Sequence, residues 1–381
     1  MFAFTEAQEM FRREVRNFAE RELMPTAKEL AKQESVPRGM VKKLAEAKLL
    51  GMGAPEEHGG QGADSISLGI AAEELARAHP FYSLTMLLGG NVYFWLQTLP
   101  EKVRQEWLPG LMGGEKLCTW ALTEPGCGSD AAAIKTRAVR DGEYYILNGE
   151  KTPISLGTEA DVAMVCTKTD PEGGARGVTN FWVPLNLPGI TRSHIVHTGW
   201  KPMAAASIVF EDVRVPSQLR MGKEGEGFLI SMMTADMGRL MLSLMGLGSA
   251  QISLEETIAY TQQRVAFGQP IAKFEGISFK IAEHATLIEA ARLLCYRTLS
   301  LRDQGLRHTK ESAMCKWWCP QVAFNAIHDC ILIHGHIGYS KEYPLEQRLR
   351  DTLGLEFTDG SAEIMKIIIG RELMGRIAVP Y

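Results

Sequence analysis

The run Ala138-Val139-Arg140-Asp141-Gly142-Glu143-Tyr144-Tyr145-Ile146-Leu147-Asn148-Gly149 interrupts a chain that is otherwise patterned for helices. Asp141-Gly142 and Asn148-Gly149 are turn signals, and short β-prone segments lie beside them. Asp-Gly and Asn-Gly next to β-branched and aromatic residues are typical of tight hairpins. This run therefore predicts a β region set between helical regions.

Further strands are expected downstream, where Pro, Gly and Thr punctuate β-prone segments at 161–168, 178–184 and 207–216. The period of the apolar residues changes near Cys118, and helical spacing returns at Gly227. We therefore expect a small all-β domain at 119–226, of about one hundred residues.

The flanking regions are expected to be helical. In 1–118, Thr5-Glu6-Ala7-Gln8 is a capping-box pattern, and apolar residues then recur at helical spacing. In 227–381, long apolar helices at 228–264, 277–304, 310–333 and 362–376 favour a four-helix bundle. The predicted fold class is α+β and multidomain, with an N-terminal all-α domain, a central β domain and a C-terminal four-helix bundle. A methionine stripe in the first bundle helix is interpreted as core or subunit interface rather than a cofactor site; it comprises Met232, Met233, Met237, Met241 and Met245.

Composition narrows the class of protein. The 381 residues carry a net charge of -4, with neither a basic excess for nucleic acid nor an acidic tail. We see no apolar run of the roughly 18 residues that a membrane helix needs, and no signal peptide. Seven scattered cysteines without a C-x-x-C pair favour the reducing cytoplasm. Cys315 and Cys319 are interpreted as core residues, and no metal site is expected.

The segment Phe357-Thr358-Asp359-Gly360-Ser361-Ala362-Glu363-Ile364 is the candidate for chemistry. Ser361 or Thr358 can cap the helix that follows, and Asp359 would lie in the loop before it, with Gly360 leaving room for a ligand. Taken alone, the same residues favour a plain helix start, since Thr, Asp and Ser are common there.

Two other segments are candidates for ligand binding. Residues 122–130 offer hydroxyls and flexible backbone N–H groups that suit phosphate or a flat heterocycle, although such loops are usually simple turns. No G-x-G-x-x-G opens a βαβ unit, and no P-loop is present. The histidines in 333–338 could suggest a metal, but a tight turn between helices is favoured.

Five motifs in order make the chain resemble the acyl-CoA dehydrogenase family over essentially its full length. The first three are Pro55-x-x-x-Gly59-Gly60-x-Gly62, Thr123-Glu124-Pro125-x-x-Gly128-Ser129-Asp130 and Val209-Phe210-Glu211-Asp212-Val213-x-Val215-Pro216. The others are Arg264-x-x-Phe267-Gly268 and Gly338-Tyr339-x-x-Glu342-Tyr343-Pro344-x-x-x-x-Arg348-x-x-Arg350-Asp351. The resemblance implies a homotetramer, built as a dimer of dimers, that binds FAD and acyl-CoA.

The resemblance also implies site residues. Leu122, Thr123 and Ser155 would contact the flavin ring, and Ser129 the pyrophosphate or the CoA. Arg264 and Phe267 would hold the FAD of a neighbouring subunit. The implied cofactor-binding set is Leu122, Thr123, Gly128, Ser129, Ser155, Arg264, Phe267, Gly335, Gly338, Ser361 and Glu363. The implied substrate-binding set is Ser129, Asp236, Arg239, Thr358 and Gly360.

The catalytic base implied by the resemblance is Asp359, which stands where the family usually has Glu. It would take the Cα proton of the thioester while the Cβ hydrogen leaves as hydride to flavin N5, and an electron-transferring flavoprotein would then accept the electrons. Some relatives carry the base just before the first bundle arginine, but Gly238 occupies that place here. Other departures from the family pattern are Pro153, Glu275, Leu332 and His336.

Asp at the base position also occurs in the dehydrogenases of cyclohexane-carboxyl-CoA, which our chain resembles in this respect. Asp is shorter than Glu by about one C–C bond, roughly 1.5 Å, which leaves room for bulk at Cα and Cβ. We therefore expect oxidation of cyclohexane-1-carboxyl-CoA to cyclohex-1-ene-1-carboxyl-CoA. The alternatives are a dehydrogenase for short or branched acyl chains, a nitroalkane-oxidase-like flavoenzyme, and a non-catalytic flavin- or CoA-binding protein.

Overall fold

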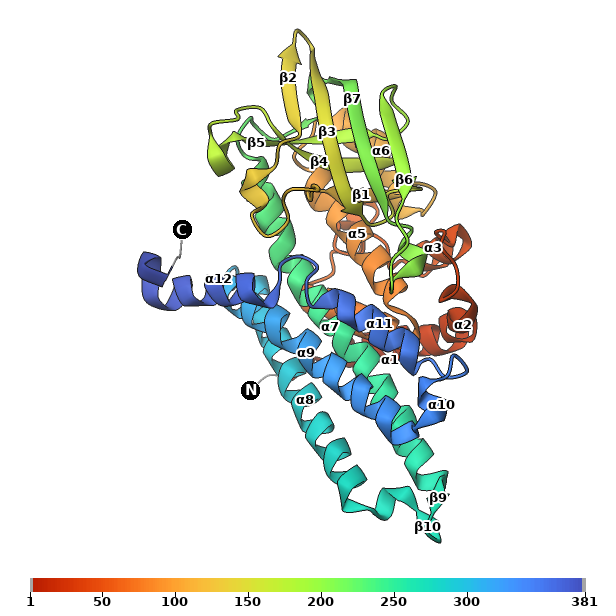
Figure 1. The fold of residues 1–381 in the computed structure, drawn as a ribbon. Helices are drawn as coiled ribbons and strands as arrows, with labels where there is room; N and C mark the ends of the chain where they lie inside the picture. The colour runs from red at the N-terminus through yellow and green to blue at the C-terminus, as the bar shows by residue number, and fades with distance from the viewer. Residues whose placement is uncertain (1–2, 379–381) are drawn as a thin grey trace.

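The computed structural model describes residues 3–378 and has a sheet at one end of a long helical body (Figure 1). The N-terminal helices lie along one side of that body, and α1 begins with the expected capping box: the Gln8 N–H donates to Thr5 Oγ1 at 3.2 Å. These helices are α1 (Glu6–Phe18), α2 (Ala27–Leu30), α3 (Arg38–Glu46), α4 (Ser65–Ala78), α5 (Pro80–Leu96) and α6 (Glu101–Met112).

The predicted hairpin and strands are confirmed. β2 and β3 pair antiparallel, with Asp141 opposite Tyr144 across the expected turn. The strands of the large sheet are β1 (Cys118–Ala121), β2 (Arg137–Asp141), β3 (Tyr144–Ile154), β4 (Val162–Lys168), β5 (Val178–Pro184), β6 (Ile190–His194), β7 (Ala206–Pro216) and β8 (Arg220–Met221). Their order is β6-β7-β3-β2-β4-β5-β8, and β1 pairs with β4 in parallel.

The C-terminal helices also follow the prediction, with α7, α8 and α9 packed together and α11 and α12 against α9. They are α7 (Gly227–Gln263), α8 (Glu275–Asp303), α9 (Thr309–His334), α10 (His336–Tyr339), α11 (Leu345–Leu355) and α12 (Ala362–Met374); the short strands β9 (Val265–Ala266) and β10 (Gln269–Pro270) follow α7. The fold class is confirmed. The domain boundaries at 118/119 and 226/227 stay a prediction.

Helix α11 was not predicted, because between the buried leucines at its two ends, Leu345 and Leu355, the side chains that it buries are polar. Arg348 is buried and pairs with Glu256 at 2.6 Å, while buried Asp351 accepts the Trp200 N–H at 2.7 Å. An apolar period cannot reveal a face made of satisfied polar groups.

Helix α7 qualifies the sequence argument about membranes. By length and composition Gly227–Gln263 could cross a bilayer, but 72% of its most apolar window is buried inside the molecule. Its apolar character therefore fits a core helix that packs against α4, α5, α8 and α9.

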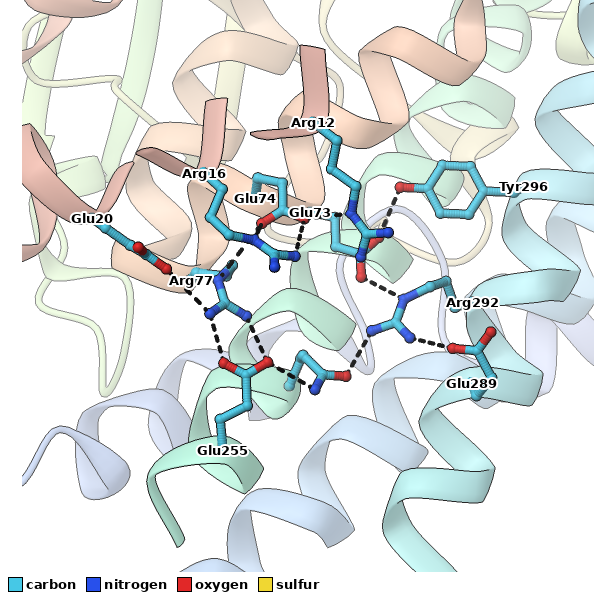
Figure 2. A network of polar contacts seen from close by, with 11 residues as sticks. Arg12, Arg16, Glu20, Glu73, Glu74, Arg77, Glu255, Glu289, Arg292 and Tyr296 are labelled. Carbon is cyan, nitrogen blue, oxygen red and sulfur yellow. Dashed lines mark hydrogen bonds and ion pairs between the residues drawn. The ribbon is translucent and has the colours of Figure 1, made fainter. Parts of the chain in front are cut away.

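Helix α4 is fixed by a buried network of charges (Figure 2). Glu74, which is 1% exposed, accepts Nε hydrogen bonds from Arg12 and Arg16 at 2.8 Å each. Glu73 accepts Arg292 Nε and the Tyr296 hydroxyl at 2.7 Å each. Because these partners come from α1 and α8, the network joins the N-terminal helices to the bundle.

All seven cysteines are free and buried. Cys315 and Cys319 are fully buried, which confirms their interpretation as core residues. Cys295 of α8 joins them, and its sulfur lies 3.6 Å from that of Cys319.

Candidate active site

The loop between α11 and α12 presents Asp359 in a constrained backbone conformation. Asp359 has φ +55° and Gly360 has φ +112°, so the chain turns sharply through left-handed geometry. Ser361 then caps α12 by accepting the Ile364 N–H at 3.5 Å, as expected. The Thr358 hydroxyl donates to the Gly354 carbonyl at 2.8 Å, which ties the loop back to α11.

Two cationic side chains hold consecutive carbonyls of this loop. Arg239 of α7 donates from Nε to the Asp359 carbonyl at 3.2 Å, and Lys316 of α9 donates from Nζ to the Gly360 carbonyl at 3.0 Å. Arg239 is itself fixed by Asp236 at 2.8 Å. The predicted residues Asp236, Arg239, Asp359 and Gly360 therefore come together, with Lys316 as an addition.

The Asp359 carboxylate lies directly over Gly238. A Cβ built on Gly238 would meet Asp359 Oδ2 at 2.6 Å, closer than atoms normally approach. The space for a side chain at 238, where some relatives carry their base, is thus occupied by the Asp359 carboxylate itself.

Burial and charge oppose each other at Asp359. Burial raises the pKa of Asp359, and the positive charges of Lys316 and Arg239 hold part of that rise back. Burial also lowers the pKa of Lys316 to about 8, against the pull of Asp359. The site therefore keeps a poorly solvated carboxylate beside a poorly solvated ammonium, an arrangement that suits a general base.

A cavity of about 420 Å³ lies between α4, α5, α7 and the α8–α9 connection. Thr234 and Met241 of its wall lie four and three positions from Gly238 on α7, whereas Gly238 and Asp359 are not among the lining residues. It is lined by Gly53, Pro55, Ala63, Ser65, Leu68, Met86, Leu87, Gly90, Asn91, Tyr93, Phe94, Gln97, Met233, Thr234, Asp236, Met237, Met241, Arg302 and His308.

The methionine stripe is therefore more than core. Met245 is buried core as expected, but Met233, Met237 and Met241 form one wall of this cavity. A larger hollow of about 610 Å³, between α3 and α6, contains none of the predicted site residues.

A second group of predicted residues meets where β1 and β3 end. The Thr123 carbonyl accepts the Thr152 N–H at 2.9 Å, and the Ser155 carbonyl accepts the Thr119 hydroxyl at 2.6 Å. Leu122, Thr123 and Ser155 are half-buried, whereas Gly128 and Ser129 are exposed. Within residues 3–378 the hydroxyls of Thr123, Ser129 and Ser155 make no hydrogen bond, which leaves them available to a ligand.

Buried Lys151 stabilises this edge. Its Nζ donates to the Leu122 carbonyl and to Glu124, at 2.8 Å each. Glu124 also accepts the N–H groups of Lys135 and Thr136, so the loop after β1 is anchored at both ends.

The remaining predicted residues lie elsewhere in the chain. Arg264 and Phe267 are exposed beside β9 and β10, at the opposite end of α7 from the sheet (Figure 1). Gly335 is exposed between α9 and α10, Gly338 is buried, and Glu363 is exposed on α12. One chain thus does not bring Arg264 and Phe267 together with Thr123 and Asp359.

The sequence did not single out Lys316, Arg302 and His308. A lysine within an apolar helical pattern was the available signal for Lys316, which is 0% exposed. Arg302 and His308 sit at the end of one helix and just before the next, so only the fold places them in a cavity.

The chain has a helical region, a β region and a second helical region, with a buried carboxylate and a cavity among its helices. This arrangement is that of an enzyme, and comparison with known proteins gives its family. Its models match as acyl-CoA dehydrogenase N-terminal domain at 5–115, middle domain at 119–213 and C-terminal domain at 225–374. The chain therefore belongs to the acyl-CoA dehydrogenase family, whose members are FAD-dependent oxidoreductases.

Individual relatives cover nearly the whole chain. The mitochondrial short-chain specific acyl-CoA dehydrogenase of Rattus norvegicus is 37% identical over 97% of this chain and 90% of its own. A chain from the structure of the electron transferring flavoprotein of Acidaminococcus fermentans is 34% identical, with a TM-score of 0.94 and coverage of 98% and 99%. The glutaryl-coenzyme A dehydrogenase complex with glutaryl-CoA is 32% identical, with a TM-score of 0.95 and coverage of 99% and 98%.

The residues present fit FAD. The free hydroxyls of Thr123 and Ser155 stand beside the Leu122 backbone on an ordered edge, which suits a flat ring with several acceptors. Exposed Gly128 and Ser129 offer backbone N–H groups to a phosphate.

Proposed function

We propose that this protein oxidises the Cα–Cβ bond of an acyl-CoA thioester, with Asp359 as the base that removes the Cα proton. The observation that carries the proposal is the buried Asp359 carboxylate over Gly238, which is near the cavity residues Thr234 and Met241 in the sequence of α7. Bound FAD supplies the hydride acceptor for such a reaction.

The loop offers a second contribution to the reaction. In the described part of the chain the Asp359 backbone N–H donates no hydrogen bond. It is therefore free to donate to the thioester oxygen as negative charge develops there, which stabilises the enolate. Arg239 and Lys316 bind the carbonyls of Asp359 and Gly360, which fixes the loop that carries this N–H.

The acyl group that we propose is cyclohexane-1-carboxyl. A carboxylate shorter by about 1.5 Å than that of Glu leaves space at Cα and Cβ for a ring, and the adjacent cavity measures about 420 Å³. A short linear acyl chain is the second candidate, favoured by the 37% identity to a short-chain specific enzyme.

Partners follow from the same family membership. We propose an electron-transferring flavoprotein as acceptor, supported by the likeness to a chain from such a structure. We also propose a cytoplasmic homotetramer that binds no nucleic acid and no membrane. Large apolar side chains exposed on α8, such as Phe279 at 61% and Leu293 at 45%, support an interface between subunits.

The test is anaerobic flavin reduction by cyclohexane-carboxyl-CoA, butyryl-CoA and octanoyl-CoA, with wild-type and Asp359→Glu enzymes. The wild type should reduce fastest with the cyclic thioester. Glu at 359 should lower kcat/KM for the ring more than for a linear chain, because a misplacement of about 1 Å can cost about 10²-fold.

Asp359→Asn is the control, since it should bind acyl-CoA without reducing the flavin. Near-normal reduction by this variant would refute the base. A wild type that prefers the linear chain, or a cyclic activity improved by Glu, would replace the ring with the short-chain substrate.

A further inference from the structure

One part of the cavity carries positive charge that has no partner of its own. Arg302, in the last turn of α8, lines the cavity, and within residues 3–378 its guanidinium makes no hydrogen bond or ion pair. Burial lowers the pKa of Arg302, while Asp303 and Asp236 raise it through space. A half-buried guanidinium without a direct partner is costly unless water or a ligand pairs with it.

The two nearby carboxylates are already committed to other groups. Asp303 accepts the Ser65 N–H at 2.9 Å and so holds the start of α4. Asp236 pairs with Arg239 at 2.8 Å and accepts the Thr309 hydroxyl at 3.0 Å. Neither is therefore a dedicated counter-ion for Arg302.

His308 adds a second unpartnered group to the same cavity. Its Nδ1 lies 2.9 Å from the Leu306 carbonyl and donates to it, so the ring is oriented by its own loop. Its Nε2 is buried and has no hydrogen-bond partner in the described structure. Because Nδ1 donates, Nε2 of the neutral ring is an acceptor, so it can hold a water molecule whose second hydrogen is left to donate to a ligand oxygen.

This polar patch, Arg302 and His308, is distinct from the base. The positive charges that act on Asp359 are those of Lys316 and Arg239. Much of the remaining wall is apolar, with Met86, Leu87 and Met241 among its residues. An apolar channel that also holds a guanidinium suits an acyl group ending in an anion.

We propose that Arg302 binds a second carboxylate on the acyl group directly, and His308 through a water held by its Nε2, so that the enzyme favours acyl-CoA thioesters of dicarboxylic acids. The proposal rests on the proposed function, because it places the acyl group in this cavity. It concerns the substituent and not the ring, and therefore applies to cyclic and linear acyl groups alike.

The experiment compares matched thioesters with and without the second carboxylate. The pairs are 4-carboxy- against 4-methylcyclohexane-carboxyl-CoA, and adipyl-CoA against hexanoyl-CoA. Within at least one pair kcat/KM should be higher for the carboxylate, by roughly 10- to 100-fold, the worth of a charged hydrogen bond. Because each ratio is taken within a pair, it does not depend on whether rings or chains are preferred.

Variants test whether Arg302 causes the higher kcat/KM for the thioester with the second carboxylate. Arg302→Met should reduce the ratio to about one, and Arg302→Lys should restore part of it, since charge without the planar fork remains. Arg307→Met is the matched control, because Arg307 lies on the same connection but pairs outward with Glu372 at 2.7 Å. The same comparison by equilibrium binding to Asp359→Asn protein separates binding from turnover.

The outcomes are distinct. Ratios at or below one in both wild-type pairs overturn the proposal, as does a high ratio that survives Arg302→Met. Activity retained by Asp359→Asn refutes the proposed base instead, and leaves the substituent ratios to be judged separately.

Discussion

The absence of a side chain at Gly238 sets where the carboxylate of Asp359, the proposed base, can lie. Gly238 is buried on α7, and Asp359 Oδ2 fills the space that a Cβ would take. A helix that carried any side chain here would push the carboxylate away from the cavity.

Gly238→Ala should therefore displace the base without touching a charge. We expect kcat for acyl-CoA oxidation to fall by about 10²-fold, as for a misplacement near 1 Å, with a smaller change in KM. Gly276→Ala on α8, where an added Cβ meets nothing within 4 Å, serves as control, and single-turnover flavin reduction is the measurement. Equal effects from both alanines would contradict the steric explanation.

Lys316 should set the pH range in which Asp359 works. Its positive charge holds back the rise in the pKa of Asp359 that burial causes. Removing the charge in Lys316→Met raises that pKa further, so the acid limb of flavin reduction should move to higher pH by about one unit or more.

The pKa of Lys316, lowered by burial to about 8, means that the wild type keeps its ammonium throughout that acid limb. Lys316→Arg should hold the limb near its wild-type position, and Lys366→Met on exposed α12 should not move it. An acid limb unchanged in Lys316→Met would argue against the electrostatic role.

Sequence reasoning reached Asp359 but not what surrounds it. The loop pattern and the family motif both pointed to that residue, because Gly360 and Ser361 follow it directly. Lys316 lies 43 positions earlier, since 359 minus 316 is 43, and only the packing of α9 under the loop brings it near.

Among the elements, α4 depends most on buried charge. Burial alone would raise the pKa of Glu74, but hydrogen bonds from Arg16 and Arg12 bring it below its usual value. A carboxyl of lowered pKa stabilises the fold above its ordinary pKa, and that stabilisation is lost as the pH falls through the lowered value.

Glu74→Gln removes the carboxylate that Arg12, Arg16 and Arg77 share. The free energy of unfolding should fall by about 3–5 kcal/mol, the usual cost of breaking a buried pair. Glu289→Gln is the control in the same network, because Glu289 is 57% exposed and should cost under about 1 kcal/mol. Urea denaturation at neutral pH measures the free energy of unfolding of both variants. Comparable losses would show that the buried Glu74 pairs do not stabilise the fold more than the exposed Glu289 pair does.

Elements with a clear apolar period were predictable, and elements that bury polar groups or stay exposed were not. The hairpin at Asp141 and Tyr144 and the long helices α7–α9 followed from turn residues and periodicity. Strand β6 was missed because its side chains are almost all exposed, so no alternation marks it.

At the scale of the whole molecule, the positions predicted to hold FAD fall into separate regions of one chain. Phe267 is 95% exposed with φ +50°, at the far end of α7 from the β1 edge. A ring held out in this way fits a contact with another copy of the chain.

Arg264→Ala should therefore weaken FAD retention while leaving the cavity beside α7 intact, because a guanidinium suits a pyrophosphate. The flavin-to-protein ratio after gel filtration should fall, and Lys273→Ala on the same tip controls for general effects. Unchanged flavin occupancy in Arg264→Ala would remove this residue from the cofactor site.

The seven buried cysteines can be used to measure local unfolding of the protein. Burial raises the pKa of Cys118 to about 12 and that of Cys330 to about 11, so neither thiol is nucleophilic in the closed molecule. An alkylating reagent would react only with molecules in which a helix or strand has detached. Mass spectrometry would show which cysteines are alkylated first. Faster labelling of Cys118 and Cys166 would mean that the β region unfolds locally more often than the bundle, and faster labelling of Cys295 and Cys319 would mean the reverse.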